Sequence, residues 1–205
     1  MPSSFHDKRP LGTLLIVSGP SGSGKTTLCR RCASEGLARY SISCTTRAPR
    51  PGERDGEDYH FLTPEQFAAR KAEGEFLEYA AVHGNQYGTL KSSISSLLEQ
   101  GVNVVMDIDV QGAARVRACA DEAIRRAYAD VYIHVPPSEL ERRLFGRGTD
   151  DGETIRLRLR NASAEDACMG LYQYILISGN RESDYARFRA LLVSLGLRTR
   201  LLGWG

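Results

Sequence analysis

Long apolar runs and an excess of one charge are both missing from this 205-residue sequence. Its aliphatic runs are far shorter than the roughly 20 residues of a membrane-spanning helix, and residues 1–10 contain no apolar segment followed by a cleavage-like site. The 27 basic and 25 acidic residues leave a formal net charge of +2, so the chain lacks the positive field typical of nucleic-acid-binding proteins. These absences predict a cytoplasmic protein that binds neither membranes nor nucleic acid and recognises anions through local groups.

Cysteines and histidines are too few and too scattered for a disulfide framework or a metal site. The five cysteines are an odd number, which argues against closed disulfide pairing. Cys29 and Cys32 form a C-x-x-C pair, but they lie one turn inside a predicted helix and no second ligand pair accompanies them. They are predicted to be small apolar core residues. The histidines show no metal-ligand spacing and are predicted to be structural or exposed; they are His6, His60, His83 and His134.

The overall composition is that of an ordinary globular protein, with 41% hydrophobic and 25% charged residues. A chain of this length can bury a substantial core as one domain, with small mobile subdomains inserted into it. The sequence leaves open whether the protein is a monomer or a homo-oligomer.

Residues 19–26, which read GPSGSGKT, fit the phosphate-loop pattern of glycine, four residues, glycine, lysine and then serine or threonine. They follow the apolar run 14–17, a predicted buried strand, and precede a predicted helix. The glycines let successive backbone N–H groups approach phosphate oxygens at the helix N-terminus. Lys25 adds a positive charge, and Thr26 offers a hydroxyl to a phosphate-bound Mg²⁺. A nucleoside triphosphate site is predicted, the alternative being a chance glycine-rich turn.

Strands and helices alternate along the chain, which predicts a parallel α/β sheet. The predicted strands cover residues 14–17, 40–46, 75–82, 102–106, 129–135 and 174–177, with a loop at 83–89. Four predicted helices have both ends defined: 27–35, ended by Gly36; 64–73, capped by Thr63; 90–100, capped by Thr89; and 111–119. A fifth helix is predicted to begin at a capping box at Ser138–Glu141, and a sixth at about residue 153. The last is predicted to begin at a Ser183 cap and to end at Leu195.

A loop with unusual capacity to bind an anion follows the second predicted strand. Residues 47–59 contain two prolines and two glycines, which exclude a helix, together with three arginines and a tyrosine. A solvated charged loop is the alternative.

Two carboxylates lie in settings that call for a partner. Glu78 is surrounded in sequence by apolar residues, so it needs an arginine, N–H donors or a ligand. Asp107 follows the predicted strand 102–106, and a carboxylate at the carboxyl end of a parallel strand beside a phosphate loop suits Mg²⁺, directly or through water.

Arginines also lie on both arms of a glycine-punctuated helical hairpin near residues 138–168, which is typical of a lid that closes over phosphates. A solvated basic face is the alternative. The arginines are Arg142, Arg143, Arg147, Arg156, Arg158 and Arg160.

From Leu14 to about Leu159 the chain resembles the guanylate kinase family. The resemblance is carried, in order, by SGPSGSGKTT at 18–27, SISCTTRAPRPGE at 41–53, EFLEY at 75–79, YGT at 87–89, DIDVQGA at 107–113 and RGT at 147–149. It implies a phosphate-loop NTPase-type parallel sheet flanked by helices, with a core of about 11–39, 90–135 and 172–196, a GMP-binding subdomain of about 40–89 and a lid of about 138–168. The implied activity is Mg²⁺-dependent transfer of the ATP γ-phosphoryl group to GMP, and to dGMP.

The resemblance also implies roles for individual residues. ATP would be bound by Gly19, Pro20, Ser21, Gly22, Ser23, Gly24, Lys25, Thr26 and Thr27. The GMP phosphate would be bound by Ser43, Arg47, Arg50, Tyr59 and Tyr87, and guanine by Glu78, Thr89 and Asp109. Catalytic roles would fall to Lys25, Arg143, Arg147 and Arg158, and metal binding to Thr26 and Asp107. The chain departs from the family where an Asn-Asp pair usually follows the last strand, because it has Ser178 and Gly179 there.

Physical chemistry supports these roles independently. Two arginine forks match the charge and shape of a phosphate dianion. One carboxylate can accept both guanine N1–H and the 2-amino group, whereas adenine presents an acceptor at N1. Two rival hypotheses are a kinase-like binding module without activity, which the intact phosphate loop opposes, and a phosphotransferase for another acceptor, which the guanine-binding set opposes.

Overall fold

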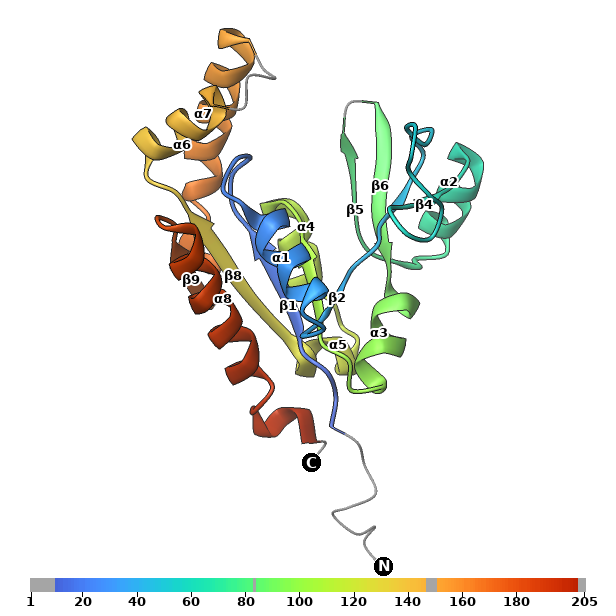
Figure 1. The fold of residues 1–205 in the computed structure, drawn as a ribbon. Helices are drawn as coiled ribbons and strands as arrows, with labels where there is room; N and C mark the ends of the chain where they lie inside the picture. The colour runs from blue at the N-terminus through green and yellow to red at the C-terminus, as the bar shows by residue number, and fades with distance from the viewer. Residues whose placement is uncertain (1–9, 83, 147–150, 203–205) are drawn as a thin grey trace, which may run out of the picture.

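The computed structural model describes residues 10–82, 84–146 and 151–202. A five-stranded parallel sheet forms the centre of the molecule (Figure 1). The strand order is β2-β7-β1-β8-β9, and every pair is parallel, which confirms the predicted fold class. The three inner strands β7, β1 and β8 are buried on both faces and are therefore nearly continuous apolar runs, whereas the edge strand β9 leaves three of its four residues exposed. They are β1 (Leu14–Ser18), β2 (Arg39–Tyr40), β7 (Val104–Asp107), β8 (Tyr128–His134) and β9 (Tyr174–Ile177).

Helices cover both faces of this sheet. On one face, α1 (Lys25–Ser34) and α8 (Arg181–Leu195) pack against alternate strand residues, and Cys29 and Cys32 are fully buried there, as predicted. On the other face lie α3 (Lys91–Glu99), α4 (Val110–Arg117) and α5 (Glu122–Ala127). In the described part of the chain, no helix has the length and apolar character needed to cross a membrane.

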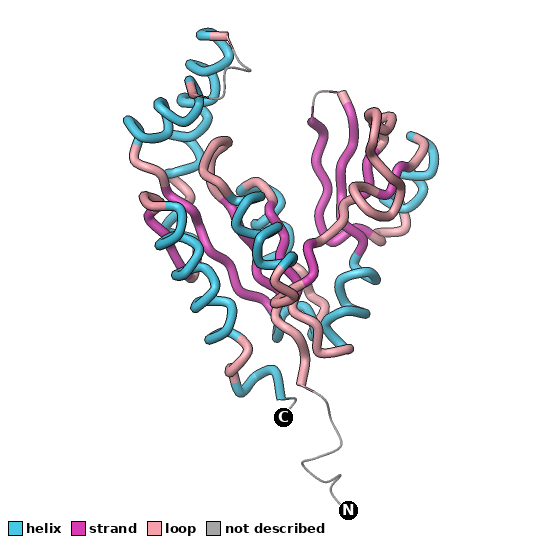
Figure 2. The backbone as a smooth tube through the Cα atoms, in the orientation of Figure 1, coloured by secondary structure: helices cyan, strands magenta, loops and turns pink. Residues whose placement is uncertain are grey.

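A second, smaller sheet forms one of the two arms that rise from the core (Figure 1). Its order is β4-β3-β6-β5, and Figure 2 shows that loops make up much of this arm. Helix α2 (Pro64–Ala72) packs its Phe67 against Phe76, with ring centroids 4.3 Å apart, and begins at the predicted Thr63 capping box. The strands are β3 (Cys44–Thr45), β4 (His60–Phe61), β5 (Phe76–Val82) and β6 (Asn85–Leu90).

The other arm is a helical hairpin of α6 (Pro137–Phe145) and α7 (Gly152–Asp166). Leu140 and Leu144 of α6 pack against Ile155 of α7 and Val135, in a hydrophobic cluster separate from those on the central sheet. Figure 1 shows this arm opposite the β5–β6 arm, with the loop that follows β1 between them. Short 3₁₀ helices cover Met169–Leu171 and Thr199–Leu202.

Two strand predictions were wrong. The single strand predicted at 40–46 is two short strands in different sheets, because Tyr40 pairs with Val105 of the central sheet whereas Thr45 pairs with Tyr87 of the second sheet. The loop predicted at 83–89 is largely β6, which pairs antiparallel with β5; position 83 itself lies outside the described residues. In both cases, pairing with another strand decides the secondary structure. The partners of Tyr40 and Thr45 are distant in sequence, and the composition of 83–89 is typical of a turn although most of the segment pairs as a strand.

Three predicted helix caps were also wrong. Leu90, rather than Thr89, is the cap residue of α3, and the Thr89 hydroxyl bonds Glu78 instead. Helix α6 begins at Pro137 without a side-chain cap, since a proline with φ preset for the first turn starts the helix one residue before Ser138. Asn180, rather than Ser183, caps α8 by accepting from two backbone N–H groups. Helix α5 was not predicted.

Candidate active site

The loop between β1 and α1 has the geometry of a phosphate loop. Its three glycines have φ of 141°, 94° and 92°, a region that side-chain-bearing residues rarely adopt. At Gly19 a Cβ would lie 2.4 Å from the Ile133 carbonyl oxygen, so only glycine fits there. Gly24 is the cap residue of α1 and leaves the N-terminal backbone N–H groups of the helix facing the loop.

Two basic side chains, Lys25 and Arg158, form hydrogen bonds with groups of this loop. The Lys25 ammonium donates to the carbonyl oxygens of Gly19 and Pro20, the latter at 3.0 Å. Arg158 reaches from α7 and donates to the Ser21 hydroxyl at 3.2 Å. A cavity of about 390 Å³ opens over the loop, and it is lined by Gly19, Ser21, Gly22, Gly24, Lys25, Thr26, Thr27, Asp107, Ile108, Asp109 and Glu165.

A carboxylate at the end of β7 joins the loop to the central sheet. Asp107 accepts a hydrogen bond from the Thr26 hydroxyl on one oxygen and from the Tyr40 hydroxyl on the other. Burial, followed by the charge of Asp107, raises the pKa of Tyr40, so its phenol remains a donor at neutral pH. The predicted metal residues Thr26 and Asp107 are therefore in direct contact.

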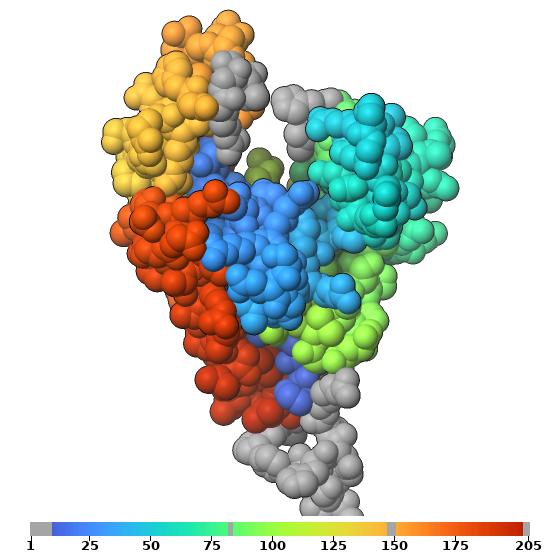
Figure 3. Space-filling model, viewed as in Figure 1, coloured from blue at the N-terminus to red at the C-terminus, as the bar shows by residue number. Residues whose placement is uncertain are grey.

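A second cavity of about 350 Å³ adjoins the first. It shares Thr26, Asp107, Ile108 and Asp109 with the cavity over the phosphate loop, so the two spaces meet at the carboxyl end of β7. Figure 3 shows a hollow between the two arms. The remaining lining residues are Arg30, Tyr40, Ser41, Ser43, Asp58, Tyr59, Glu78, Ala80, Tyr87 and Met106.

Glu78 brings a buried carboxylate to this second cavity. The residue is 6% exposed, and its Oε1 accepts from the Thr89 hydroxyl at 2.9 Å. Burial raises the pKa of Glu78, and the nearby charge of Asp109 adds to the rise. Ser43 Oγ lies 3.3 Å from the Thr89 hydroxyl, which extends the polar wall. Four of the predicted guanine and phosphate residues thus lie within one small volume.

Asp109 has a structural role as well as a place in both cavities. It is the cap residue of α4, and its Oδ1 accepts from the Gly112 N–H at 2.7 Å. This bond fixes the carboxylate at the junction of the two cavities.

The arginine loop lies beside the second cavity. Arg47 Nη2 donates to Glu53 Oε1 at 2.9 Å, and its guanidinium lies over the Tyr59 ring, 5.4 Å from the centroid. Tyr59 in turn meets Tyr87 edge to face at 6.0 Å. Tyr59 and Tyr87 line the cavity, whereas Arg47 and Arg50 are not among its described lining residues.

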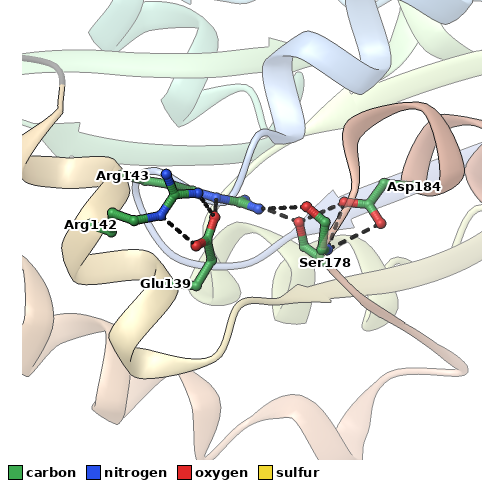
Figure 4. A network of polar contacts seen from close by, with 6 residues as sticks. Glu139, Arg142, Arg143, Ser178 and Asp184 are labelled. Carbon is green, nitrogen blue, oxygen red and sulfur yellow. Dashed lines mark hydrogen bonds and ion pairs between the residues drawn. The ribbon is translucent and has the colours of Figure 1, made fainter.

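The predicted lid arginines fall into different places. Figure 4 shows Arg143 reaching from α6, where it bonds Glu139 at 2.7 Å, to Ser178 after β9 at 3.0 Å. Hydrogen bonds from Arg142 and then from Arg143 lower the pKa of Glu139 to about 2. Arg143 is therefore held at the base of the arm in this structure, while Arg158 reaches the phosphate loop. Arg147 lies outside the described residues.

A third cavity of about 550 Å³ lies between α6, the phosphate loop and the start of α8. Ser178, Gly179 and Asp184 form its wall on the α8 side, and the Ser178 hydroxyl donates to Asp184 at 2.7 Å (Figure 4). It adjoins the loop at Gly22 and Gly24.

Sequence reasoning missed several residues that line the two adjoining cavities. Arg30 lies one helical turn after Thr26 on α1, a spacing that places both on the same face and could have identified it. Tyr40, Asp58 and Glu165 carried no local signal, because only folding brings β2, the loop before β4 and α7 together at the site.

Known guanylate kinases are similar to this chain in sequence and in fold. The family model for guanylate kinase matches residues 11–194. The guanylate kinase of Syntrophotalea carbinolica is 45% identical over 192 residues, covering 91% of this chain and 88% of that protein. The guanylate kinase of Dechloromonas aromatica is 46% identical over 189 residues, covering 91% of each chain. A crystal structure of guanylate kinase from Anaplasma phagocytophilum matches with a TM-score of 0.72 and 28% identity, covering 94% of this chain and 90% of that chain.

Proposed function

The chain belongs to the guanylate kinase family, and on this premise we propose that it transfers the γ-phosphoryl group of ATP to GMP, giving ADP and GDP. The observation that carries the proposal is the meeting of two cavities at Thr26, Asp107 and Asp109. One cavity lies over a phosphate loop and the other contains a buried carboxylate. A donor and an acceptor bound in these cavities would meet at their junction, which is what direct transfer requires.

The phosphate loop is the proposed donor site. Residues 19–27 would bind the ATP phosphates through backbone N–H groups at the N-terminus of α1. Lys25, which donates to loop carbonyl oxygens in this structure, would donate to phosphate oxygens instead and stabilise the transferring charge.

The second cavity is the proposed acceptor site. The Glu78 carboxylate would accept from guanine N1–H and from the 2-amino group, assisted by Thr89 and Asp109. The raised pKa of Glu78 fits a site that a ligand with two donors would complete. The phosphate of GMP, or of dGMP, would be bound by Ser43, Arg47, Arg50, Tyr59 and Tyr87.

The residues at the junction fit Mg²⁺. Thr26 and Asp107 present only oxygen donors, already within hydrogen-bond distance of each other, and magnesium prefers oxygen ligands and takes few of them from protein. When bound, the ion would neutralise phosphate charge during transfer. Tyr40 orients Asp107 for this role through its hydrogen bond.

The arm of α6 and α7 is the proposed lid, over about residues 138–168, and residues about 40–89 are the proposed GMP-binding subdomain. Closure would bring Arg147 and Arg158 to the phosphates and would require Arg143 to leave Ser178. We also propose that the protein acts in the cytoplasm, and that it binds nucleotides but neither nucleic acid nor membranes.

The proposal is tested by measuring ADP release from ATP with each nucleoside monophosphate in turn. We expect GMP, and more weakly dGMP, to support turnover far above AMP, CMP and UMP. Equal rates with AMP and GMP would refute the acceptor assignment.

A further inference from the structure

The side chain of Glu53 joins two arginines of the loop at 47–59. Its Oε1 accepts from Arg47 Nη2 at 2.9 Å, and its Oε2 accepts from the backbone N–H of Arg50 at 2.7 Å. The backbone N–H of Glu53 also donates to the Arg50 carbonyl at 3.0 Å, which closes a tight turn. One carboxylate therefore holds a side chain and a turn in a fixed relation.

The arginine that Glu53 holds is well ordered by its other neighbours. Arg47 Nη1 donates to the Ala48 carbonyl at 2.6 Å, and the guanidinium lies 5.4 Å from the Tyr59 ring and 5.9 Å from the Phe61 ring. The side chains of Arg47 and Glu53 are only 16% and 19% exposed. A guanidinium has five N–H donors in a rigid fork, so these bonds orient it and leave other donors for a ligand.

Glu53 stays ionised over the neutral range. Hydrogen bonds from Arg47 and then from the Arg50 backbone lower the pKa of its carboxyl group, and the same contact with Glu53 raises the pKa of Arg47. Both partners therefore stay charged and the ion pair persists at any pH near neutrality.

We propose that Glu53 is a positioning residue for the acceptor phosphate. Its carboxylate holds the Arg47 guanidinium beside Tyr59 and Tyr87, and it also holds the turn at Arg50. Both arginines can then bind the phosphate without prior reorganisation of the loop. This inference rests on the proposed function, since it takes the acceptor to be a nucleoside monophosphate. Glu53 itself does not touch the substrate. Its effect is confined to the phosphate end of the acceptor, because Glu53 lies in the loop between β3 and β4, whereas Glu78 and Thr89 lie on β5 and β6.

The substitution Glu53→Gln separates the two contacts. Its one carbonyl oxygen can still accept from the Arg50 N–H and keep the turn, whereas its amide group presents donors to the donors of Arg47. The Arg47 fork then loses a charge-assisted bond while the loop remains folded. Glu53→Ala removes both contacts. A matched control is Glu57→Gln. Glu57 lies in the same loop, and its exposed carboxylate forms an ion pair with the exposed Arg54 at 3.5 Å.

The test compares the binding of GMP with that of guanosine, which lacks the phosphate, in wild type, Glu53→Gln, Glu53→Ala and Glu57→Gln, with thermal unfolding as the check of folding. For Glu53→Gln we expect the Kd of GMP to rise by about tenfold, the loss of one charged hydrogen bond, while the inhibition constant of guanosine changes by less than about twofold. Glu53→Ala should lose more GMP affinity, and Glu57→Gln should match wild type.

Two results would overturn the inference. One is unchanged or tighter GMP binding by Glu53→Gln, since tighter binding would mean that Glu53 competes with the phosphate for Arg47. The other is an equal loss of GMP and guanosine affinity, which would indicate a general structural role. Failure of wild type to prefer GMP over AMP would instead refute the proposed function, so the two failures are distinguishable.

Discussion

The carboxylate of Glu78 lies almost fully buried and accepts a hydrogen bond from the Thr89 hydroxyl. Folding raises its pKa, so between the unfolded and folded pKa values the folded chain binds more protons than the unfolded chain. The stability of the folded protein therefore falls as the pH rises through that window. An ionised Glu78 is a cost to stability that the proposed ligand contact would offset.

We expect Glu78→Gln to raise the melting temperature at pH 8, because the neutral amide keeps an acceptor for Thr89 and removes the buried charge. The difference from wild type should shrink as the pH falls toward 4, because the Glu78 carboxyl group becomes increasingly protonated in both the folded and the unfolded state. Thermal unfolding of both proteins across this pH range measures it. A lower melting temperature for the variant at pH 8 would show that the carboxylate stabilises the fold.

The same substitution should weaken guanine selectivity. At least one guanine N–H would lose its acceptor in a buried site, which should cost about 2–4 kcal/mol in kcat/KM for GMP. Activity with AMP should change little or rise, because the amide can donate to adenine N1. The measurement is kcat/KM for GMP and AMP with wild type and variant; an unchanged ratio would assign selectivity to other residues.

At the scale of elements, helix α7 contributes its Arg158 to the phosphate loop, where the guanidinium donates to the Ser21 hydroxyl. If this arginine engages phosphate on closure, Arg158→Ala should lower kcat by about two orders of magnitude and change GMP affinity little. Asn161→Ala, an exposed position one turn further along α7, is the control and should behave as wild type. Arg147→Ala is expected to resemble Arg158→Ala. Loss of GMP affinity alone would contradict the lid assignment.

Helix α8 offers a test of its own N-terminus. The Asn180 side chain accepts from the N–H groups of Glu182 and Ser183, so Asn180→Ala should cost about 1 kcal/mol of unfolding free energy. In a chain of this size that corresponds to about 2–4 °C in melting temperature. Ser183→Ala, at the residue that sequence reasoning chose as the cap, should cost little. Equal losses from both substitutions would contradict the assignment of the cap.

Local end signals predicted the ends of some helices and misplaced the caps of α3, α6 and α8, and the sequence did not show which sheet a short strand joins. The Thr63–Gln66 capping box and the glycine after α1 both lie where the sequence indicates. Tyr40 and Thr45 are five residues apart in one β-rich stretch, yet they pair with strands of two different sheets. The residue pattern predicts that a segment is an extended strand, whereas the strand with which it pairs depends on the whole fold.

At the scale of the whole molecule, a hollow lies between the two arms (Figure 3), and the two adjoining cavities meet at the carboxyl end of β7. The phosphate loop was predictable because its chemistry is contiguous in sequence. The joint metal role of Thr26 and Asp107 was predicted and the two are in contact, whereas the hydrogen bond from Tyr40 to Asp107 was not predictable, since it joins two strands far apart in sequence. The contacts of Arg143 with Ser178 and of Arg47 with Glu53 were also not predicted, because the folded chain decides which hydrogen-bond or ion-pair partner each arginine meets.

The central claim is that phosphoryl groups pass directly from ATP to GMP across the junction of the two cavities. The most direct measurement is the product balance of a reaction with ATP, GMP and Mg²⁺, separated by ion-exchange chromatography. We predict GDP and ADP in equal amounts, with little inorganic phosphate, and neither product from Lys25→Met. ADP that forms with inorganic phosphate and without GDP would contradict the account, since it would show hydrolysis rather than transfer.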